Sequence, residues 1–362
     1  MSQVLEGVKV LELASVLAGP LAGTALAVRG ATVTKVERPP HGDVTRTWKS
    51  AGEPADQEAS AYYASANAGK RVVWRDLASA EGREWLEASL AEHDVVLHNF
   101  KASDLVKFGM EPEGLALRHP HLVNVRLVGF PGAPERLAYD VVVQAETGFM
   151  SMNGEPGSKP LRMPVALMDV LASHQIRTAV LEGLLGRSQG RTGAYAEVSL
   201  EGSGLSALVN QSTNYLMNGE VPTAQGPIHP NIAPYGDLME CADGWMVLAV
   251  GSDRQFAGLC SVLGHAEWAN LPDYRTNVDR LRNREALLTA LNGVASSRTR
   301  AHWDAVFQAH GIPAGVVRRM DEVFAPGSAG EATLIVDEDG VGLRPSPVAY
   351  QMHWFQTGNA MR

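Results

Sequence analysis

The sequence predicts an α/β fold: a Rossmann-like, doubly wound parallel sheet in a large domain, followed by a smaller α+β domain. Three observations lead to this prediction. The first half alternates short apolar runs with helical patterns, as βαβ units do. The 362-residue length exceeds one ordinary domain. After Gly236 the pattern changes to a hairpin followed by helices.

The first βαβ unit is marked clearly. Residues 8–13 form a largely apolar run that predicts a buried strand. Pro20 near the first turn and Gly30 at the end delimit a helix over 20–29, because proline suits helix starts and glycine suits helix ends. Residues 31–37 predict the next strand. A right-handed crossover and parallel pairing follow from this order.

Later elements extend the same layer. Strands are predicted at 93–98, 122–128 and 194–200, with helical patterns at 79–91 and 102–107 between the earlier ones. Apolar residues recur at helical spacing over 170–185, and Asp169 comes directly before this helix. These elements place the large domain at residues 1–200.

The rest of the chain divides into three parts. Residues 201–225 are expected to form a linker that opens with a helix around 201–215. Residues 226–320 are expected to form the small α+β domain, with a hairpin over 236–250 that turns at Ala242-Asp243-Gly244 and helices at 254–263, 283–296 and 301–310. Residues 321–362 are expected to return to the large domain.

Composition narrows the class of protein. A net charge of −9 argues against a nucleic-acid binder, which needs an extended basic surface. The two cysteines, Cys241 and Cys260, match neither a disulfide framework nor a metal motif. The apolar stretch 13–28 is shorter than the ~20 residues of a membrane span, and Glu6 and Glu12 occupy the place of a basic signal-peptide region. We therefore expect a cytoplasmic protein with no membrane or nucleic-acid partner.

Basic residues at or near the ends of predicted strands indicate one compact polyanionic ligand. This set comprises Lys35, Arg38, Lys70, Arg71, Lys101 and Lys107. Taken one at a time, such a residue is more often a solvated surface charge than a ligand contact. The first loop, residues 14–20, lies where α/β folds bind ligands, but its glycines do not form the GxGxxG pattern of a dehydrogenase.

Asp169 supports two interpretations. An aspartate before a helix is a common N-cap. It is also a candidate nucleophile, because the positive end of a helix is expected to keep a carboxylate ionised. The histidines show no metal-binding spacing, so no metal site is expected.

These pieces occur together in an order that resembles family III CoA-transferases, the group of formyl-CoA and carnitine CoA-transferases. The similar blocks are LEGVKVLEL (5–13), AGP (18–20), GA (30–31), KVER (35–38), GD (42–43), Asn67 with KR (70–71), NF (99–100), FG (108–109), YD (139–140), the Asp169 segment, GRTG (190–193) and HGIPAG (310–315). They cover nearly the whole chain. Their order is more specific than any single motif.

The resemblance implies roles for particular residues. Asp169 corresponds to the catalytic aspartate, and the positions expected to line the CoA site are Val16, Arg38, Asn99, Phe100, Lys107 and Tyr139, with Lys70 and Arg71 close by. CoA is implied as a substrate, with no tightly bound cofactor. An interlocked homodimer is implied as well, with the active site between large and small domains.

The implied reaction moves CoA from an acyl-CoA donor to a carboxylic acid. It passes through an acyl-aspartyl anhydride and an aspartyl-CoA thioester. Two departures bear on the substrate: Leu17 stands in place of a glutamine of formyl-CoA transferase, and residues 227–235 replace its glycine-rich loop. In that segment His229 and Asn231 are candidates to orient the acceptor acid, and equally to stabilise a turn.

Two alternatives remain open. The same superfamily contains α-methylacyl-CoA racemases, which pair a histidine with the aspartate. Here Tyr139 stands at the histidine position, and a phenol with an ordinary pKa of about 10 is a poor base at neutral pH. The other alternative is a non-catalytic CoA-binding protein.

Overall fold

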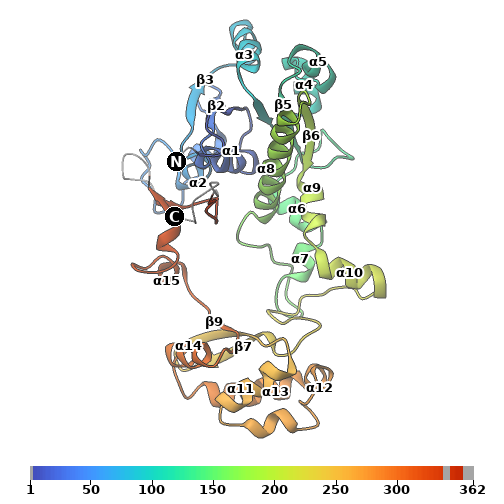
Figure 1. The fold of residues 1–362 in the computed structure, drawn as a ribbon, viewed down its shortest axis with the longest axis vertical. Helices are drawn as coiled ribbons and strands as arrows, with labels where there is room; N and C mark the ends of the chain where they lie inside the picture. The colour runs from blue at the N-terminus through green and yellow to red at the C-terminus, as the bar shows by residue number, and fades with distance from the viewer. Residues whose placement is uncertain (1–2, 337–342, 354–362) are drawn as a thin grey trace, which may run out of the picture. The chain divides into compact units, whose positions relative to one another are not determined.

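The computed structural model describes residues 3–336 and 343–353. The chain forms two compact units (Figure 1). The first unit comprises Met1–Ser151, Leu161–Pro222 and Ala332–Arg362, and the second comprises Met152–Pro160 and Thr223–Glu331.

A six-stranded parallel sheet forms the centre of the first unit, with the order β3-β2-β1-β4-β5-β6. The strands are β1 (Lys9–Glu12), β2 (Thr32–Glu37), β3 (Arg71–Trp74), β4 (Val95–His98), β5 (Val123–Val128) and β6 (Ala194–Ser199). Leu11 on β1 pairs with Thr34 on one side and Val96 on the other. The predicted parallel sheet is confirmed, and β3 is an additional strand that the sequence pattern did not reveal.

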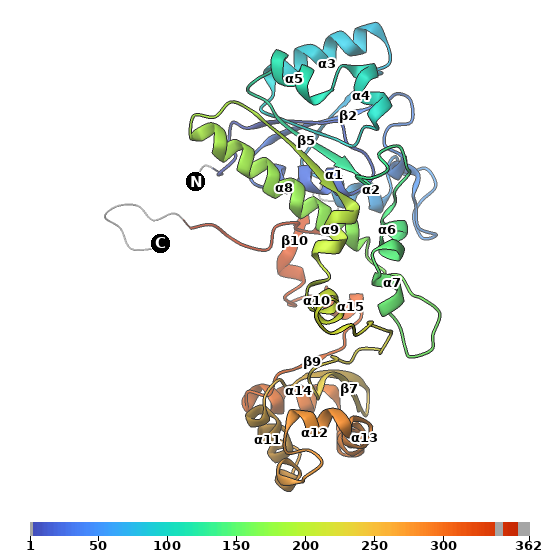
Figure 2. The ribbon, with the colours of Figure 1, turned by 90° about the vertical axis from the view of Figure 1, so that its right-hand side faces the viewer.

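Helices cover both faces of this sheet (Figure 2). The helices up to residue 188 are α1 (Ala18–Val28), α2 (Ala61–Asn67), α3 (Ala80–Glu92), α4 (Ala102–Phe108), α5 (Pro112–Arg118), α6 (Asp140–Glu146), α7 (Phe149–Met152) and α8 (Leu167–Ser188), with a 3-10 turn η1 (Val44–Thr47). Apolar residues of α1 and α8 pack on one face, around Val10, Val95 and Val123. Those of α3, α4 and α5 pack on the other, around Leu11 and Val96. Alternate strand residues therefore enter two separate cores.

Helix α8 fixes the position of Asp169. It packs against α1 and the sheet, and Gly183 allows close approach because a Cβ there would lie 2.6 Å from Val123 Cγ1. The helix begins at Leu167, so Asp169 lies inside its first turn. The N-cap residue is Ala166, which makes no side-chain cap. The interpretation of Asp169 as an N-cap is therefore wrong.

The segment expected to be a linker begins with two helices. They are α9 (Leu200–Ser206) and α10 (Val209–Asn218), and residues up to Pro222 belong to the first unit. Helix α10 exposes large apolar side chains, with Leu216 and Met217 each 77% exposed.

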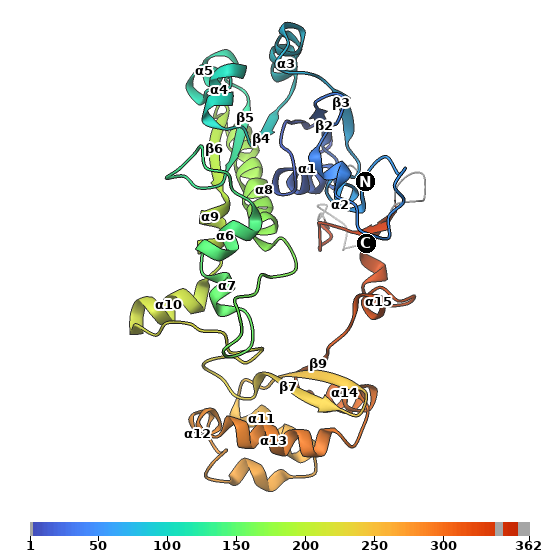
Figure 3. The same ribbon diagram turned by 180° about the vertical axis from the view of Figure 1, so that it is seen from behind.

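The second unit contains a three-stranded antiparallel sheet covered by helices (Figure 3). Its elements are β7 (Tyr235–Cys241), β8 (Gly244–Ala249), α11 (Asp253–Val262), η2 (Ala266–Asn270), α12 (Asn277–Arg282), α13 (Arg284–Ala295), α14 (Arg300–Ala309), β9 (Ala314–Val316) and α15 (Met320–Val323). The predicted hairpin is confirmed as the β7–β8 pair. Met246 and Leu248 of the sheet pack with Phe256, Leu291 and other helix residues in a separate core.

The last described elements are η3 (Glu331–Thr333), β10 (Leu334–Val336) and β11 (Leu343–Pro345). Arg177 of α8 donates a hydrogen bond to the Pro347 carbonyl over 3.2 Å, which ties residues after β11 to the first unit. Within residues 3–336 and 343–353, no helix combines the length and the apolar character needed to cross a bilayer.

Candidate active site

The candidate site lies at the carboxyl edge of the parallel sheet. Strands β1 and β4 are neighbours there, and the chain leaves them in opposite directions, which is where open α/β sheets bind ligands. A cavity of about 410 Å³ opens at this place. Its lining includes residues after β1, β4 and β5, together with Asp169 at the start of α8.

Asp169 lies beside a second carboxylate, Asp140, and each residue is 9% exposed. Asp140 is held firmly: its Oδ1 accepts the Met168 N–H over 2.6 Å, and its Oδ2 accepts the Gln144 side-chain amide over 2.6 Å. Among the described residues, none hydrogen-bonds or ion-pairs with the Asp169 carboxylate. Asp140 is therefore fixed by the fold, whereas Asp169 is left available to the cavity.

Burial and the charge of Asp140 raise the pKa of Asp169 from its ordinary 3.8 to about 7. The sequence led us to expect that the positive end of the helix keeps this carboxylate ionised. That expectation is wrong at mildly acidic pH, because burial and a like charge outweigh the helix terminus. Perturbed pKa values of this size are typical of functional carboxylates in cavities.

Tyr62 on α2 lies near Asp169 and Asp140, although it lines neither cavity, and sequence reasoning did not single it out. Burial, followed by the charges of Asp169, Asp140 and Asp43, raises its pKa to about 12. Its ring packs edge-on against Trp48, with centroids 5.2 Å apart. The phenol therefore stays protonated near the two carboxylates and can donate a hydrogen bond.

The turn between β1 and α1 forms another wall of the cavity. Val16 and Leu17 line it, as do Asn99, Phe100 and Tyr139. Asn99 holds this turn from β4, since its Oδ1 accepts the Ser15 N–H and its Nδ2 donates to the Ser15 carbonyl, both over 3.3 Å. The structure thus brings five of the predicted residues together with Asp169.

A second cavity of about 300 Å³ adjoins the first, since Leu13, Ser15, Phe100 and Asp104 line both. Its wall carries four cationic side chains: Lys35, which pairs with Asp43, the predicted Arg38 and Lys107, and Arg75, which the sequence did not single out. Four acidic residues line it as well: Glu37, Asp43, Asp76 and Asp104. Phe108 packs beside Phe100 with ring centroids 5.0 Å apart. Cations and aromatic rings suit a phosphorylated, heterocyclic ligand.

Lys70 and Arg71 line neither cavity. The Lys70 side chain is fully buried, and its Nζ lies 2.8 Å from Glu12 Oε2. Arg71 opens β3 at its amino end, away from the carboxyl edge. The expectation that this pair converges on the ligand is not met, because Lys70 pairs internally and β3 runs parallel to its neighbours.

His229 and Asn231 belong to the second unit, in the segment before β7. The His229 Nδ1 accepts the Asn231 N–H over 3.1 Å, and its ring packs edge-on against Tyr235. Arg284 donates to the carbonyls of His229 and Tyr235. These contacts show the turn-stabilising role that the sequence left open.

Within residues 3–336 and 343–353 there is no group of three or more His, Cys, Asp or Glu side chains arranged to hold a metal ion.

Comparison with known proteins agrees with this geometry. Residues 5–360 match the model of CoA-transferase family III. A succinate–glutarate CoA-transferase of Agrobacterium fabrum is 36% identical over 346 residues, covering 93% of this chain and 86% of the relative. The human succinyl-CoA:glutarate CoA-transferase is 32% identical over 324 residues, covering 89% and 73%. A CAIB/BAIF family protein from Brucella suis has a crystal structure similar to this one, with a TM-score of 0.84, 34% identity and coverage of 100% and 95%. The chain therefore belongs to CoA-transferase family III, as the order of its sequence blocks predicted.

Proposed function

We propose that this CoA-transferase moves CoA between two small dicarboxylic acids, with Asp169 as the nucleophile. The observation that carries the proposal is the Asp169–Asp140 pair, in which a buried carboxylate without a partner lies beside a fixed one. The pair lies at a cavity that adjoins a second one, whose lining includes Arg38, Arg75 and Lys107.

The carboxylate pair favours covalent catalysis for an electrostatic reason. When ionised, Asp169 is poorly solvated and repelled by Asp140, so it is more basic and more nucleophilic than an exposed aspartate. Attack on a thioester carbonyl converts it into an uncharged anhydride. The repulsion disappears in that step, which lowers the barrier relative to an isolated aspartate.

The proposed reaction conserves the free energy of the thioester. An Asp169 oxygen bonds to the acyl carbon, the C–S bond breaks, and CoA leaves as thiolate. The thiolate then attacks the Asp169 carbonyl carbon, the donor acid leaves with the bridging oxygen, and an aspartyl-CoA thioester remains. An acceptor carboxylate attacks this thioester, and the same two steps in reverse release the new acyl-CoA.

We place the phosphorylated nucleotide part of CoA, the CoA handle, in the second cavity. Arg38, Arg75 and Lys107 supply positive charge for its phosphates, and Phe100 lies where the two cavities meet. A handle tethered there keeps the thiolate beside the anhydride, so the return attack is effectively intramolecular. Val16, Asn99 and Tyr139 would line the path of the pantetheine arm toward Asp169.

The substrate class comes from the relatives and from Arg126. The relatives' names include succinate, glutarate and mesaconate transferases, all of which act on dicarboxylates. Arg126 lines the first cavity, pairs with Glu197 over 3.1 Å, and has one buried guanidinium nitrogen without a hydrogen-bond partner. We assign the second carboxylate of the substrate to this side of the cavity. We also propose that His229 and Asn231 contact the acceptor acid, and the family resemblance alone supports this role.

A homodimer, interlocked as the resemblance implies, is part of the proposal. Its support is the apolar surface of α10 and the following residue Val221, where Val209, Leu216, Met217 and Val221 are each at least 67% exposed. Surfaces of this kind mark protein interfaces more often than free faces.

The test is incubation of the enzyme with succinyl-CoA, followed by hydroxylamine trapping and mass spectrometry of the Asp169 peptide. The proposal expects a hydroxamate at Asp169 and release of CoA. Exchange of the α-proton in deuterated water without an adduct would support a racemase instead. Binding without either result would support the non-catalytic alternative.

Asp169→Asn is the matched control for this test. It keeps the shape of the side chain but cannot form the anhydride, so it should bind CoA and give no hydroxamate. Transfer activity retained by Asp169→Asn would refute the assignment.

A further inference from the structure

Val16 adopts an unusual backbone conformation in the wall of the first cavity. It lies in the turn between β1 and α1, and its φ of 72° is in the left-handed region. A β-branched residue rarely takes this conformation, because its Cβ substituents crowd the backbone. Such a residue persists only where neighbouring contacts force it.

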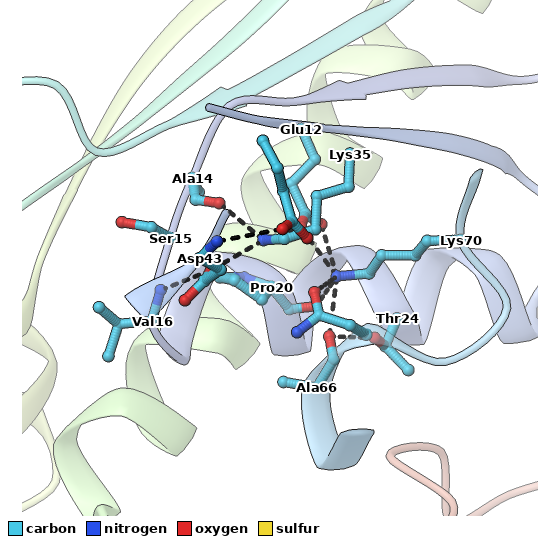
Figure 4. A network of polar contacts seen from close by, with 12 residues as sticks. Glu12, Ala14, Ser15, Val16, Pro20, Thr24, Lys35, Asp43, Ala66 and Lys70 are labelled. Carbon is cyan, nitrogen blue, oxygen red and sulfur yellow. Dashed lines mark hydrogen bonds and ion pairs between the residues drawn. The ribbon is translucent and has the colours of Figure 1, made fainter. Parts of the chain in front are cut away.

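A buried ion pair contacts the backbone of this turn at Val16 and at Ala14 (Figure 4). The Asp43 Oδ2 accepts the Val16 N–H over 3.2 Å, and Lys35 Nζ donates to the Ala14 carbonyl over 3.1 Å. Asp43 and Lys35 also pair with each other over 3.1 Å, and both side chains are 1% exposed. The Asp43–Lys35 pair therefore fixes the turn through two backbone groups, the Val16 N–H and the Ala14 carbonyl.

The orientation of the Asp43 carboxylate is itself fixed. Its Oδ1 accepts the Thr45 N–H over 3.0 Å and the Thr45 hydroxyl over 2.7 Å. Its own backbone N–H donates to Glu37 Oε2 over 3.0 Å. The acceptor for Val16 consequently cannot rotate away without breaking several other hydrogen bonds.

The pair belongs to a larger buried cluster. Glu12 lies 3.2 Å from Lys35 Nζ and 2.8 Å from Lys70 Nζ. Lys70 donates to the Pro20 carbonyl over 2.7 Å and to the Ala66 carbonyl over 2.8 Å, which connects the first turn of α1 with α2. Two acids and two amines balance in charge, so the cluster extends the support of the turn into α1.

From this arrangement we propose that Asp43, together with Lys35, is a positioning residue for the transfer reaction. The pair holds the Ala14–Val16 turn in its left-handed conformation and thereby sets where Val16 and Leu17 stand in the cavity that Asp169 lines. A buried ion pair contributes little to stability compared with apolar packing, but it can fix one geometry. The inference rests on the proposed function, because the geometry it fixes is that of the acyl-CoA arm.

The test is a double-mutant cycle between Asp43→Asn and Val16→Gly. Asn at 43 is isosteric but has one acceptor oxygen in place of two, and it carries no charge to pair with Lys35. It cannot serve the Val16 N–H, Lys35 Nζ and the Thr45 N–H together, so the support of the turn is weakened. We expect kcat of the first half-reaction to fall about 10- to 100-fold, the usual effect of a small misplacement. Glycine at 16 adopts a positive φ without strain, so the turn then needs less support from Asp43. In the Val16→Gly background, Asp43→Asn should therefore lower kcat less than about threefold.

A second variant, in which the buried charges stay balanced, distinguishes a loss of positioning from a loss of folding. Lys35→Met with Asp43→Asn removes one charge of each sign and leaves Glu12 and Lys70 as a balanced pair. It should show the same kinetic loss and the same rescue by Val16→Gly. Thr24→Val is the matched control, because it deletes another buried hydrogen bond of α1, to the Ala66 carbonyl, without touching the turn.

An equal loss in both Val16 backgrounds would overturn the proposal, as would a loss of thermal stability without a kinetic change. Failure of the proposed function looks different: the wild-type enzyme would then transfer no CoA at all. In that case the CoA dissociation constant, measured by calorimetry over the same cycle, still reports on the turn. If the effects of Asp43→Asn and Val16→Gly on that dissociation constant are coupled, the positioning role is supported. If the two effects simply add, the positioning role is overturned.

Discussion

Asp169→Asn should make the protein more stable, and by an amount that depends on pH. The unfolded chain titrates Asp169 near 3.8, whereas the folded state holds its pKa at about 7. The folded state therefore binds the proton more tightly, and this residue's contribution to stability is fully present below pH 3.8 and lost as pH rises to about 7. Asparagine is neutral throughout and avoids that loss.

The magnitude follows from the two pKa values. Each pKa unit corresponds to about 1.4 kcal/mol, so a difference of about 3 units makes the ionised wild type about 4 kcal/mol less stable than a neutral isostere above pH 7. Near pH 5.5 the difference is about 2 kcal/mol. At about 2 to 4 °C per kcal/mol for a domain of this size, the melting temperature should rise by roughly 10 °C at pH 8 and by about half as much at pH 5.5.

The assay is thermal unfolding of wild type and Asp169→Asn by circular dichroism at a series of pH values. Asp104→Asn is a suitable control, since this carboxylate also lines the cavity but is more exposed. It corrects for removal of one negative charge from a chain with a net charge of −9. A stability gain that is independent of pH, or a loss at pH 8, would refute the electrostatic reasoning.

Two further predictions concern catalysis and CoA binding. For the wild type, kcat/KM of the first half-reaction should fall about tenfold per pH unit below about pH 7, because attack requires ionised Asp169. Asp140→Asn should move the midpoint of this pH profile to lower pH, because it removes the like charge beside Asp169. A midpoint that does not move would contradict the role of Asp140. Arg38→Ala, Arg75→Ala and Lys107→Ala should each weaken CoA binding about five- to tenfold in calorimetry. Lys9→Ala, on the amino end of β1, is the control, and an equal effect there would contradict the proposed CoA site.

Periodicity was enough to predict most of the parallel sheet. The strands after Gly7 and Asp94 are largely apolar, as expected where both faces are covered, and the strand after Gly30 keeps Val33 and Val36 among polar residues. The strand β3 was missed because it has only four residues, opens with Arg71 and has no fully buried position. Short strands at the edge of a sheet leave little apolar signal.

The candidate site was predicted only where residues follow strands directly. Val16, Asn99 and Arg38 come just after β1, β4 and β2, so topology alone brings them to one edge. Asp140 and Tyr62 were not found as partners of Asp169, because only tertiary packing of α6 and α2 brings them near α8. No spacing in the sequence encodes that contact.

The buried cluster leaves a partial signal in the sequence. Glu12 and Lys35 occupy strands that are expected to be buried, and a charge there requires an opposite charge nearby. Lys35 was instead predicted to face a polyanionic ligand, and the structure corrects this, because its Nζ is buried and pairs with Glu12 and Asp43. The charge rule requires a partner for each of these residues but does not name it. It does not identify Lys70 or Asp43, since both come from loops whose course depends on the rest of the fold.

The central claim is that an oxygen of Asp169 takes part in every turnover. The most direct measurement uses an acceptor dicarboxylate labelled with ¹⁸O in unlabelled water, followed by mass spectrometry of the Asp169 peptide. If the acceptor attacks an aspartyl thioester, one acceptor oxygen remains on Asp169 when the new acyl-CoA leaves, so the peptide gains ¹⁸O and the donor acid of later turnovers carries it away. Labelled donor acid together with an unlabelled Asp169 peptide would contradict the account, because the acceptor would then have attacked the acyl-CoA directly.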